Sequence, residues 1–259
     1  MKLSKIVLIA LLAMGALFLA AEMTSALAQE AVDATAAAAE GEDGEVSITF
    51  FQLLRLGGAF MIPLIGLSVA TVGLVIYNAI MLREKNFIRP EVVQTLREQL
   101  ESVDVEGARQ TCEENPCVVA NIVGAGLDRI TSEDLDPAFI EKAMEESSAE
   151  ELNGPYLFVA LLSIIATISP MVGLLGTVSG MIKAFRNIAF GGMGRPEELA
   201  TNISEALMTT ASGLSVGIPA MFAFFFFKTR YAKMTAQIAR YTGDCYHALV
   251  DGVKRSANG

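Results

Sequence analysis

Three long apolar stretches alternate with polar segments along the chain. They are residues 57–82, 156–185 and 202–227, and the first contains no charged side chain. Each is long enough to cross a bilayer as a helix, which needs about 20 apolar residues. Because a polar bend at residues 187–200 separates the second stretch from the third, the pattern predicts three transmembrane helices.

The second and third stretches differ from a helix that faces only lipid, because they carry many small and hydroxylated residues. Small residues let helices approach closely, and hydroxyl groups need partners that hydrocarbon does not supply. We therefore expect these helices to pack on other helices and to line a polar feature. The glycines predicted to pack are Gly173, Gly176, Gly180, Gly213 and Gly217. Pro170 and Pro219 are expected to kink the helices or to make room for neighbours.

The chain before the first apolar stretch divides into two parts. Residues 1–28 resemble a secretory signal peptide, with Lys2 and Lys5 before an apolar run and an Ala-Leu-Ala pattern at 26–28. The alternative is an uncleaved membrane helix, but the apolar run is short and Glu22 ends it, which favours cleavage. Residues 29–49 are rich in Ala, Glu, Asp and Gly and predict a flexible acidic tail.

The remaining segments predict an all-α membrane protein with long helical extensions. Residues 50–82 form the first transmembrane helix with its lead-in, and residues 83–155 a cytoplasmic helical domain. In that domain a helix is expected at 90–100, and further helical segments after Pro116 and from Pro137. Residues 156–227 contain the second and third transmembrane helices, and residues 228–259 a cytoplasmic C-terminal helix. The apolar stripe of the 90–100 helix is Val92, Val93, Leu96 and Leu100.

Basic residues beside the apolar stretches predict the orientation. They follow the first and third stretches directly, and the positive-inside rule places such flanks in the cytoplasm. The mature N-terminus would then lie outside. The flanking residues are Arg83, Lys85, Arg89, Lys228, Arg230 and Lys233. Lys183, Arg186 and Arg195 at the outer bend are a mild departure from the rule.

Composition and charge exclude several functions. A net charge of -10 makes nucleic acid a poor partner. Cys112 and Cys117 match no complete zinc set and Cys245 is far along the chain, so we expect inert thiols and no metal site. His247 is expected to be exposed. No nucleophile-base-acid arrangement is visible, so the chain is not expected to be an enzyme or to need a cofactor.

Glu205 is the one ionisable residue predicted within the central hydrocarbon depth of the three helices. Because burying a charge in a bilayer is costly, Glu205 is a functional candidate. The alternative is an interfacial Glu that caps the start of the third helix, where acidic side chains favour the helix dipole.

Two motifs carry a resemblance to a known family. Residues 169–181 read SPMVGLLGTVSGM, and residues 203–214 read ISEALMTTASGL, followed by GIPA at 217–220. In this order and spacing they closely resemble the MotA/TolQ/ExbB proton channel family. The resemblance extends over roughly residues 57–246. The ExbB/TolQ branch fits better than the MotA branch, which has four spans and a larger cytoplasmic domain.

The resemblance implies an assembly and a set of site residues. It implies a cyclic pentamer in lipid, around two membrane helices of an ExbD- or TolR-like partner that supplies an aspartate as proton carrier. Glu205 falls on the family's acidic position, and Thr177 and Thr210 fall on its pore-lining threonines. At 100° per residue, Thr209 shares a face with Glu205 and Ser212, whereas Thr210 lies with Gly213 and Gly217. Thr209 and Ser212 therefore remain alternative pore hydroxyls.

The function expected from the resemblance is that of an inner-membrane proton-channel subunit. It would couple the proton-motive force to a TonB- or TolA-like protein and drive outer-membrane import, as ExbB-like proteins do. A TolQ-like role in envelope integrity and a passive scaffold for a periplasmic partner remain alternatives. A solute transporter is disfavoured, because three spans contain no inverted repeat.

Overall fold

The computed structural model describes residues 58–83, 87–130, 137–191 and 196–258. The predictions for residues 1–28, 29–49 and 50–57 lie outside these ranges. Within them, every regular element is a helix. Three helices are long and apolar enough to cross a membrane. The prediction of an all-α membrane protein with three spans is therefore confirmed.

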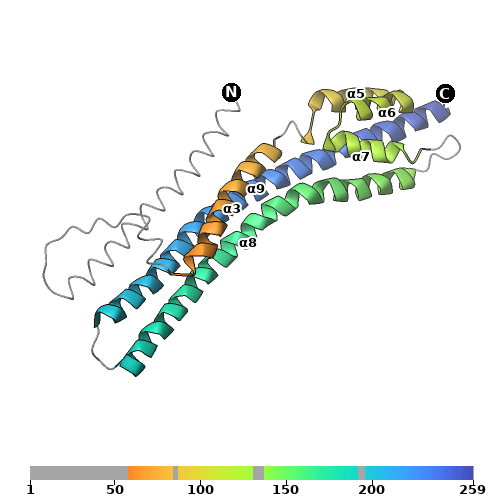
Figure 1. The fold of residues 1–259 in the computed structure, drawn as a ribbon. Coiled ribbons are helices and arrows are strands. Elements are labelled where there is room, and N and C mark those ends of the chain that lie inside the picture. The colour runs from red at the N-terminus through yellow and green to blue at the C-terminus, as the bar shows by residue number, and fades with distance from the viewer. Residues whose placement is uncertain (1–57, 84–86, 131–136, 192–195, 259) are drawn as a thin grey trace. The chain divides into compact units, whose positions relative to one another are not determined.

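The helices fall into a long set and a short set (Figure 1). The long helices are α3 (Met61–Met81), α8 (Pro137–Gly191) and α9 (Pro196–Asn258). The short helices are α5 (Pro90–Glu101), α6 (Val105–Glu114) and α7 (Val118–Leu127). The chain forms two compact units, and each long helix contributes to both.

Helices α8 and α9 are longer than their apolar stretches. Each apolar stretch continues into polar residues without a break, so α8 covers 55 residues and α9 covers 63. The bend predicted at 187–200 is wrong in extent, because α8 reaches Gly191 and α9 already begins at Pro196. Proline is favoured at the first helical position, which is where Pro196 begins α9.

Unit 1 consists of Met1–Ile76 and Ala160–Phe225, described from Gly58 onward. Helices α8 and α9 run antiparallel and side by side in it, and α3 packs against both (Figure 1). Its core cluster is Ile165, Ala166, Val216 and Ala220, with Leu67 and Leu74 of α3 packed against them. Many large apolar side chains of these helices are exposed, among them Ile62, Leu174, Phe185, Phe222 and Phe225. Such a surface suits contact with lipid or with other helices.

Unit 2 consists of Tyr77–Val159 and Phe226–Gly259. The predicted start of α5 at Pro90 is confirmed, and its buried residues are the predicted Val92, Val93, Leu96 and Leu100. Helix α6 was not predicted, because its sequence is mostly polar. It begins where Asp104 accepts a hydrogen bond from the Gly107 N–H at 3.0 Å, an N-cap that satisfies a free helix donor.

Close backbone contacts hold the helices of unit 2 together. A Cβ added at Gly252 of α9 would lie 2.8 Å from the carbonyl oxygen of Leu100, so only glycine allows this approach. The Tyr231 hydroxyl of α9 donates to the carbonyl of Leu152 on α8 at 2.5 Å. In α3, the buried Asn78 donates through Nδ2 to the carbonyl of Phe158 at 3.1 Å.

The buried stripe of α5 gives a first prediction. Leu96 is 0% exposed, so we expect Leu96→Ala to cost about 2–5 kcal/mol, as other large-to-small core changes do. Thermal unfolding of the detergent-solubilised chain, followed by circular dichroism, measures the change. The control is Gln94→Ala on the exposed face of the same helix, expected within about 0.5 kcal/mol of wild type. Equal effects of the two changes would contradict the packing described for α5.

Candidate functional site: the glycine seam between α8 and α9

A line of glycines brings the backbones of α8 and α9 into contact within unit 1. We call this line the glycine seam; its residues are Gly173, Gly176 and Gly180 of α8 and Gly213 and Gly217 of α9. A Cβ added at Gly213 would lie 2.6 Å from the carbonyl oxygen of Ser169 and 3.1 Å from Cα of Gly173. A Cβ at Gly180 would lie 2.7 Å from Cβ of Ala206. The five glycines predicted to pack therefore lie at one contact between two antiparallel helices.

The prolines border this seam. A Cβ added at Gly217 would lie 2.9 Å from Cδ of Pro170, so Gly217 leaves room for the proline ring. Pro219 lies inside α9, which continues past it. A proline ring inside a helix removes one backbone donor.

Three threonines beside the seam make different hydrogen bonds. The Thr210 hydroxyl crosses from α9 to donate to the carbonyl of Gly173 on α8 at 3.0 Å. Thr177 donates to Leu174 of its own helix at 2.7 Å. Thr209 donates to Ala206 of its own helix, also at 2.7 Å, and a Cβ at Gly176 would collide with its side chain.

Burial separates the two neighbouring threonines of α9. Thr209 is 1% exposed because it packs against Gly176 inside the seam. Thr210 and Thr177 keep part of their surface open, as does the alternative Ser212. Of the two neighbouring threonines, only Thr210 therefore keeps surface open outside this helix pair.

Glu205 lies near the end of the seam where α8 ends and α9 begins. Its Oε1 accepts from the ammonium group of Lys183 on α8 at 2.9 Å. The Glu205 side chain is 20% exposed and that of Lys183 is 45% exposed. On its other side the carboxylate lies against Gly58, where an added Cβ would overlap Oε1. Because the φ angle of Gly58 is +64°, this position also suits glycine for its backbone.

The helix-cap alternative for Glu205 does not fit the structure. Helix α9 begins at Pro196, nine residues before Glu205, which is about two and a half turns at 3.6 residues per turn. Caps and dipole effects act within the first turn. Sequence reasoning missed Lys183 and Gly58 as neighbours of Glu205, because the pairing of Lys183 and Glu205 depends on how two helices align.

The cysteines lie in unit 2 and have no role in this site. Cys112, Cys117 and Cys245 are free and buried. Among the described residues, no group of three or more His, Cys, Asp or Glu side chains is placed to hold a metal ion. Burial, followed by the neighbouring Cys117, raises the pKa of the Cys112 thiol to about 11. A protonated, buried thiol is a poor nucleophile and a poor metal ligand.

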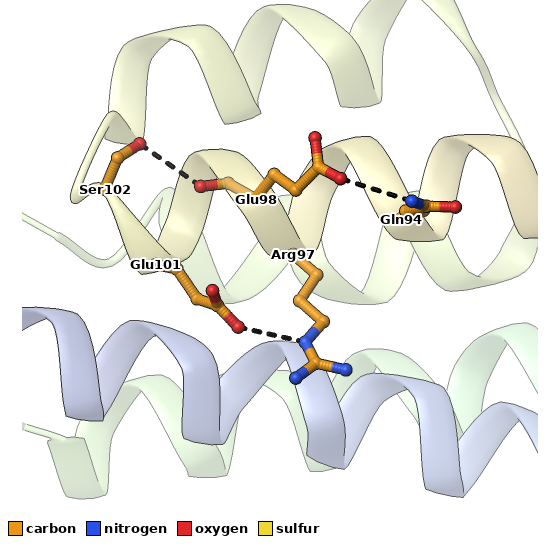
Figure 2. Close-up of polar contacts among 5 residues, drawn as sticks. All are labelled: Gln94, Arg97, Glu98, Glu101 and Ser102. Carbon is orange, nitrogen blue, oxygen red and sulfur yellow. Dashed lines mark hydrogen bonds and ion pairs between the residues drawn. The ribbon is translucent and has the colours of Figure 1, made fainter.

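A concave region of unit 2 is the other candidate among the described residues. An open cavity of about 440 Å³ lies between α5 and the C-terminal half of α9. The polar side chains that α5 contributes pair with one another: Arg97 Nε lies 3.1 Å from Oε1 of Glu101, and Gln94 donates to Glu98 at 3.2 Å (Figure 2). These are exposed contacts between residues four apart, which stabilise a helix by about 0.2–0.5 kcal/mol each. Such contacts are typical of a solvated helix face and not of a reactive site.

Comparison with known proteins agrees with the predicted resemblance. The model of the MotA/TolQ/ExbB proton channel family matches residues 115–240. A putative biopolymer transport protein ExbB-like 3 of Synechocystis is 29% identical over 195 residues, covering 72% of this chain and 89% of its own. Biopolymer transport protein ExbB of Xanthomonas campestris is 32% identical over 114 residues, 44% of this chain and 45% of its own. The Tol-Pal system protein TolQ of Haemophilus influenzae is 35% identical over 83 residues, 32% of this chain and 36% of its own.

Three apolar helices and a polar-lined glycine seam define a helical membrane protein. Residues 115–240, which contain the seam, match the model of the MotA/TolQ/ExbB proton channel family. The predicted resemblance to this family is confirmed. The family is one of proton channels and not of enzymes.

The seam predicts opposite effects for two glycine substitutions in α9. Gly213→Ala places a Cβ 2.6 Å from the backbone of Ser169, so we expect α8 and α9 to separate and the chain to lose about 1–3 kcal/mol. Gly243→Ala on the same helix meets nothing within 4 Å and should gain about 0.5–1 kcal/mol from higher helix propensity. Urea or thermal unfolding in detergent measures both. A stabilising Gly213→Ala would contradict the close approach.

The Cys112 thiol gives a prediction about pH. A raised pKa means that the folded chain keeps Cys112 protonated at pH 7–9 and forms the thiolate only as pH approaches about 11. Since the thiolate is the species that alkylates, iodoacetamide should label Cys112 slowly in the folded chain at pH 8 and rapidly after unfolding in detergent. Peptide mapping by mass spectrometry separates Cys112 from the other cysteines. Rapid labelling of the folded chain at pH 8 would contradict the burial of this thiol.

Proposed function

We propose that this chain is a subunit of a proton-conducting complex in the inner membrane, with Glu205, Thr177 and Thr210 on the proton path. The observation that carries the proposal is the position of Glu205. It is a partly buried carboxylate on a membrane helix, next to a seam beside which the hydroxyl groups of Thr177 and Thr210 stay partly open. Intramembrane ionisable groups commonly mark ion pathways and proton relays.

The hydroxyl groups can relay protons but cannot store them. A threonine hydroxyl both donates and accepts hydrogen bonds, so Thr177 and Thr210 can hold water or bond a carboxyl group. Neither ionises near neutral pH, and Glu205 lies near one end of the seam. The path therefore needs a second carrier, which we propose is an aspartate on the membrane helix of an ExbD- or TolR-like partner.

The assembly is part of the same proposal. Several copies of the chain, as a cyclic pentamer, would surround two partner helices and be surrounded by lipid. The exposed apolar side chains on α8 and α9 supply surface for both contacts. The basic flanks after α3 and near Lys228 favour a cytoplasmic C-terminus and a periplasmic mature N-terminus.

The energy of proton entry would drive a TonB- or TolA-like protein. One proton crossing 100 mV releases about 2.3 kcal/mol, so a few protons can drive a sizeable conformational step. Two of the relatives reported above carry the ExbB name, which favours a role in outer-membrane import. The match to a TolQ protein favours envelope integrity as the second candidate. A passive scaffold is the alternative that needs no proton flux.

Proton uptake by vesicles tests the proposal. Vesicles would contain the chain with and without its single-helix partner and with an imposed membrane potential. We expect uptake to need the partner and to fall about five- to a hundredfold in Thr177→Val and Glu205→Ala, since a lost buried polar partner costs about 1–3 kcal/mol. Thr95→Val is the matched control, because Thr95 also bonds its own helix, 3.1 Å from the carbonyl of Glu91, but lies on α5.

Further variants of the same assay separate the neighbouring hydroxyls. Thr210→Val is expected to lower uptake more than Thr209→Val, because Thr209 is buried in the seam. Undiminished uptake in Thr177→Val and Glu205→Ala would remove both residues from the path and favour the scaffold.

A further inference from the structure

The ion pair between Lys183 and Glu205 joins α8 to α9 beside a close contact of the two helices. Lys183 comes three residues after Gly180, and Glu205 directly precedes Ala206. A Cβ at Gly180 would lie 2.7 Å from Cβ of Ala206, so the two backbones nearly touch beside the pair. The 2.9 Å contact between Lys183 Nζ and Glu205 Oε1 therefore depends on how the two helices pack, because the residues are 22 apart in sequence.

A third element closes the other side of the Glu205 carboxylate. Gly58 lies directly before α3, where the Met61 N–H donates to the Gly58 carbonyl at 3.2 Å. Two separate reasons exclude a side chain at Gly58. Its φ angle is +64°, which favours glycine, and Glu205 Oε1 occupies the space that a Cβ would need. The carboxylate thus lies between the ammonium group of α8 and the backbone that leads into α3.

The surroundings give the carboxylate one counter-charge among the described residues. Lys183 is the charged group of α8 that faces it, and Gly58 contributes no side chain. Arg186, three residues farther along α8, is exposed and makes no ion pair within the described ranges. A partly buried carboxylate without a partner is costly, and the ammonium group of Lys183 supplies that partner.

We propose that Lys183 is a positioning residue that regulates Glu205; this rests on the proposed function. The ion pair holds the ionised carboxylate against Gly58. When Glu205 binds a proton from the aqueous side, an O–H bond forms and the ionic contact to Lys183 is lost. The Lys183 ammonium keeps its own protons and turns toward water, which its long stem and 45% exposure permit. The O–H bond of the neutral carboxyl group then breaks as the proton passes to the aspartate carboxylate proposed for the partner helix, and the ion pair re-forms.

Proton uptake and unfolding measurements on the full chain with its partner test this role. Lys183→Met keeps an unbranched apolar stem but removes the charged end of the side chain, and we expect uptake to fall about three- to tenfold, with recovery in Lys183→Arg. Arg186→Met is the matched control and should retain wild-type uptake. In Glu205→Gln, which already lacks the ion pair, adding Lys183→Met should cause no further loss. The charge-exchanged variant Lys183→Glu/Glu205→Lys should recover the unfolding temperature that either single change lowers.

The outcomes separate this role from the proposed function. Loss of uptake in Glu205→Gln with full uptake in Lys183→Met would overturn the role of Lys183 and leave the proposed function standing. Full uptake in both variants would overturn both. Independent, additive losses would show that Lys183 acts elsewhere and would also overturn it. Gly58→Ala, which displaces the carboxylate, should lower uptake as much as Lys183→Met does, and full uptake there would contradict the position described for Glu205.

Discussion

The contact between the backbones of Gly173 and Gly213 sets the geometry on which the membrane part depends. In lipid, burying apolar surface between helices gives little free energy, so association rests on close packing and on hydrogen bonds. Here a Cβ at Gly173 would lie 3.3 Å from Cα of Gly213, which is tighter than ordinary packing. The same closeness lets the Thr210 hydroxyl reach the carbonyl of Gly173 at 3.0 Å. It also fixes the register that brings Gly176 against Thr209 and Lys183 against Glu205.

Different physics holds unit 2. Helices α5, α6 and α7 are short and amphipathic or apolar, and their buried side chains form a core of the kind found in water-soluble proteins. Two polar contacts strengthen it: the Tyr231 hydroxyl donates to Leu152, and Asn121 Nδ2 donates to Glu151 Oε1 at 2.8 Å. A change in this core alters the stability of the chain, whereas a change in the glycine seam also alters the polar groups beside it.

The sequence predicts the parts of this structure that depend on local pattern. Three apolar stretches give the spans, the stripe of Val92, Val93, Leu96 and Leu100 gives the buried face of α5, and the motifs give the family. Helix α6 could not be predicted from apolar periodicity, because only Ala108 and Cys112 of its residues are buried. The bend was placed too widely, because polar residues continue a helix beyond its membrane depth.

The sequence likewise predicts only part of the candidate site. Glu205 and the two threonines stand out by residue type and by motif, but their partners do not. The pairing with Lys183 joins residues 22 apart and depends on the length of both helices and on their register. The contact with Gly58 joins residues still farther apart. From the sequence, Lys183 is only a basic residue that departs from the positive-inside rule. Its ion pair with Glu205 supplies a physical reason for that departure.

The ion pair between Lys183 and Glu205 is weak, whereas the glycine seam holds α8 and α9 together. The ion pair can therefore break while the two helices stay packed. An exposed ion pair contributes about 0.2–1 kcal/mol, and the pair of Lys183 and Glu205 is only partly buried. A proton that crosses 100 mV releases about 2.3 kcal/mol, which exceeds the ion pair. The seam is a set of backbone contacts and a partly buried hydrogen bond from Thr210 to Gly173, none of which involves a titrating group. Under the proposed function, protonation of Glu205 would therefore release the carboxylate while α8 and α9 keep their register.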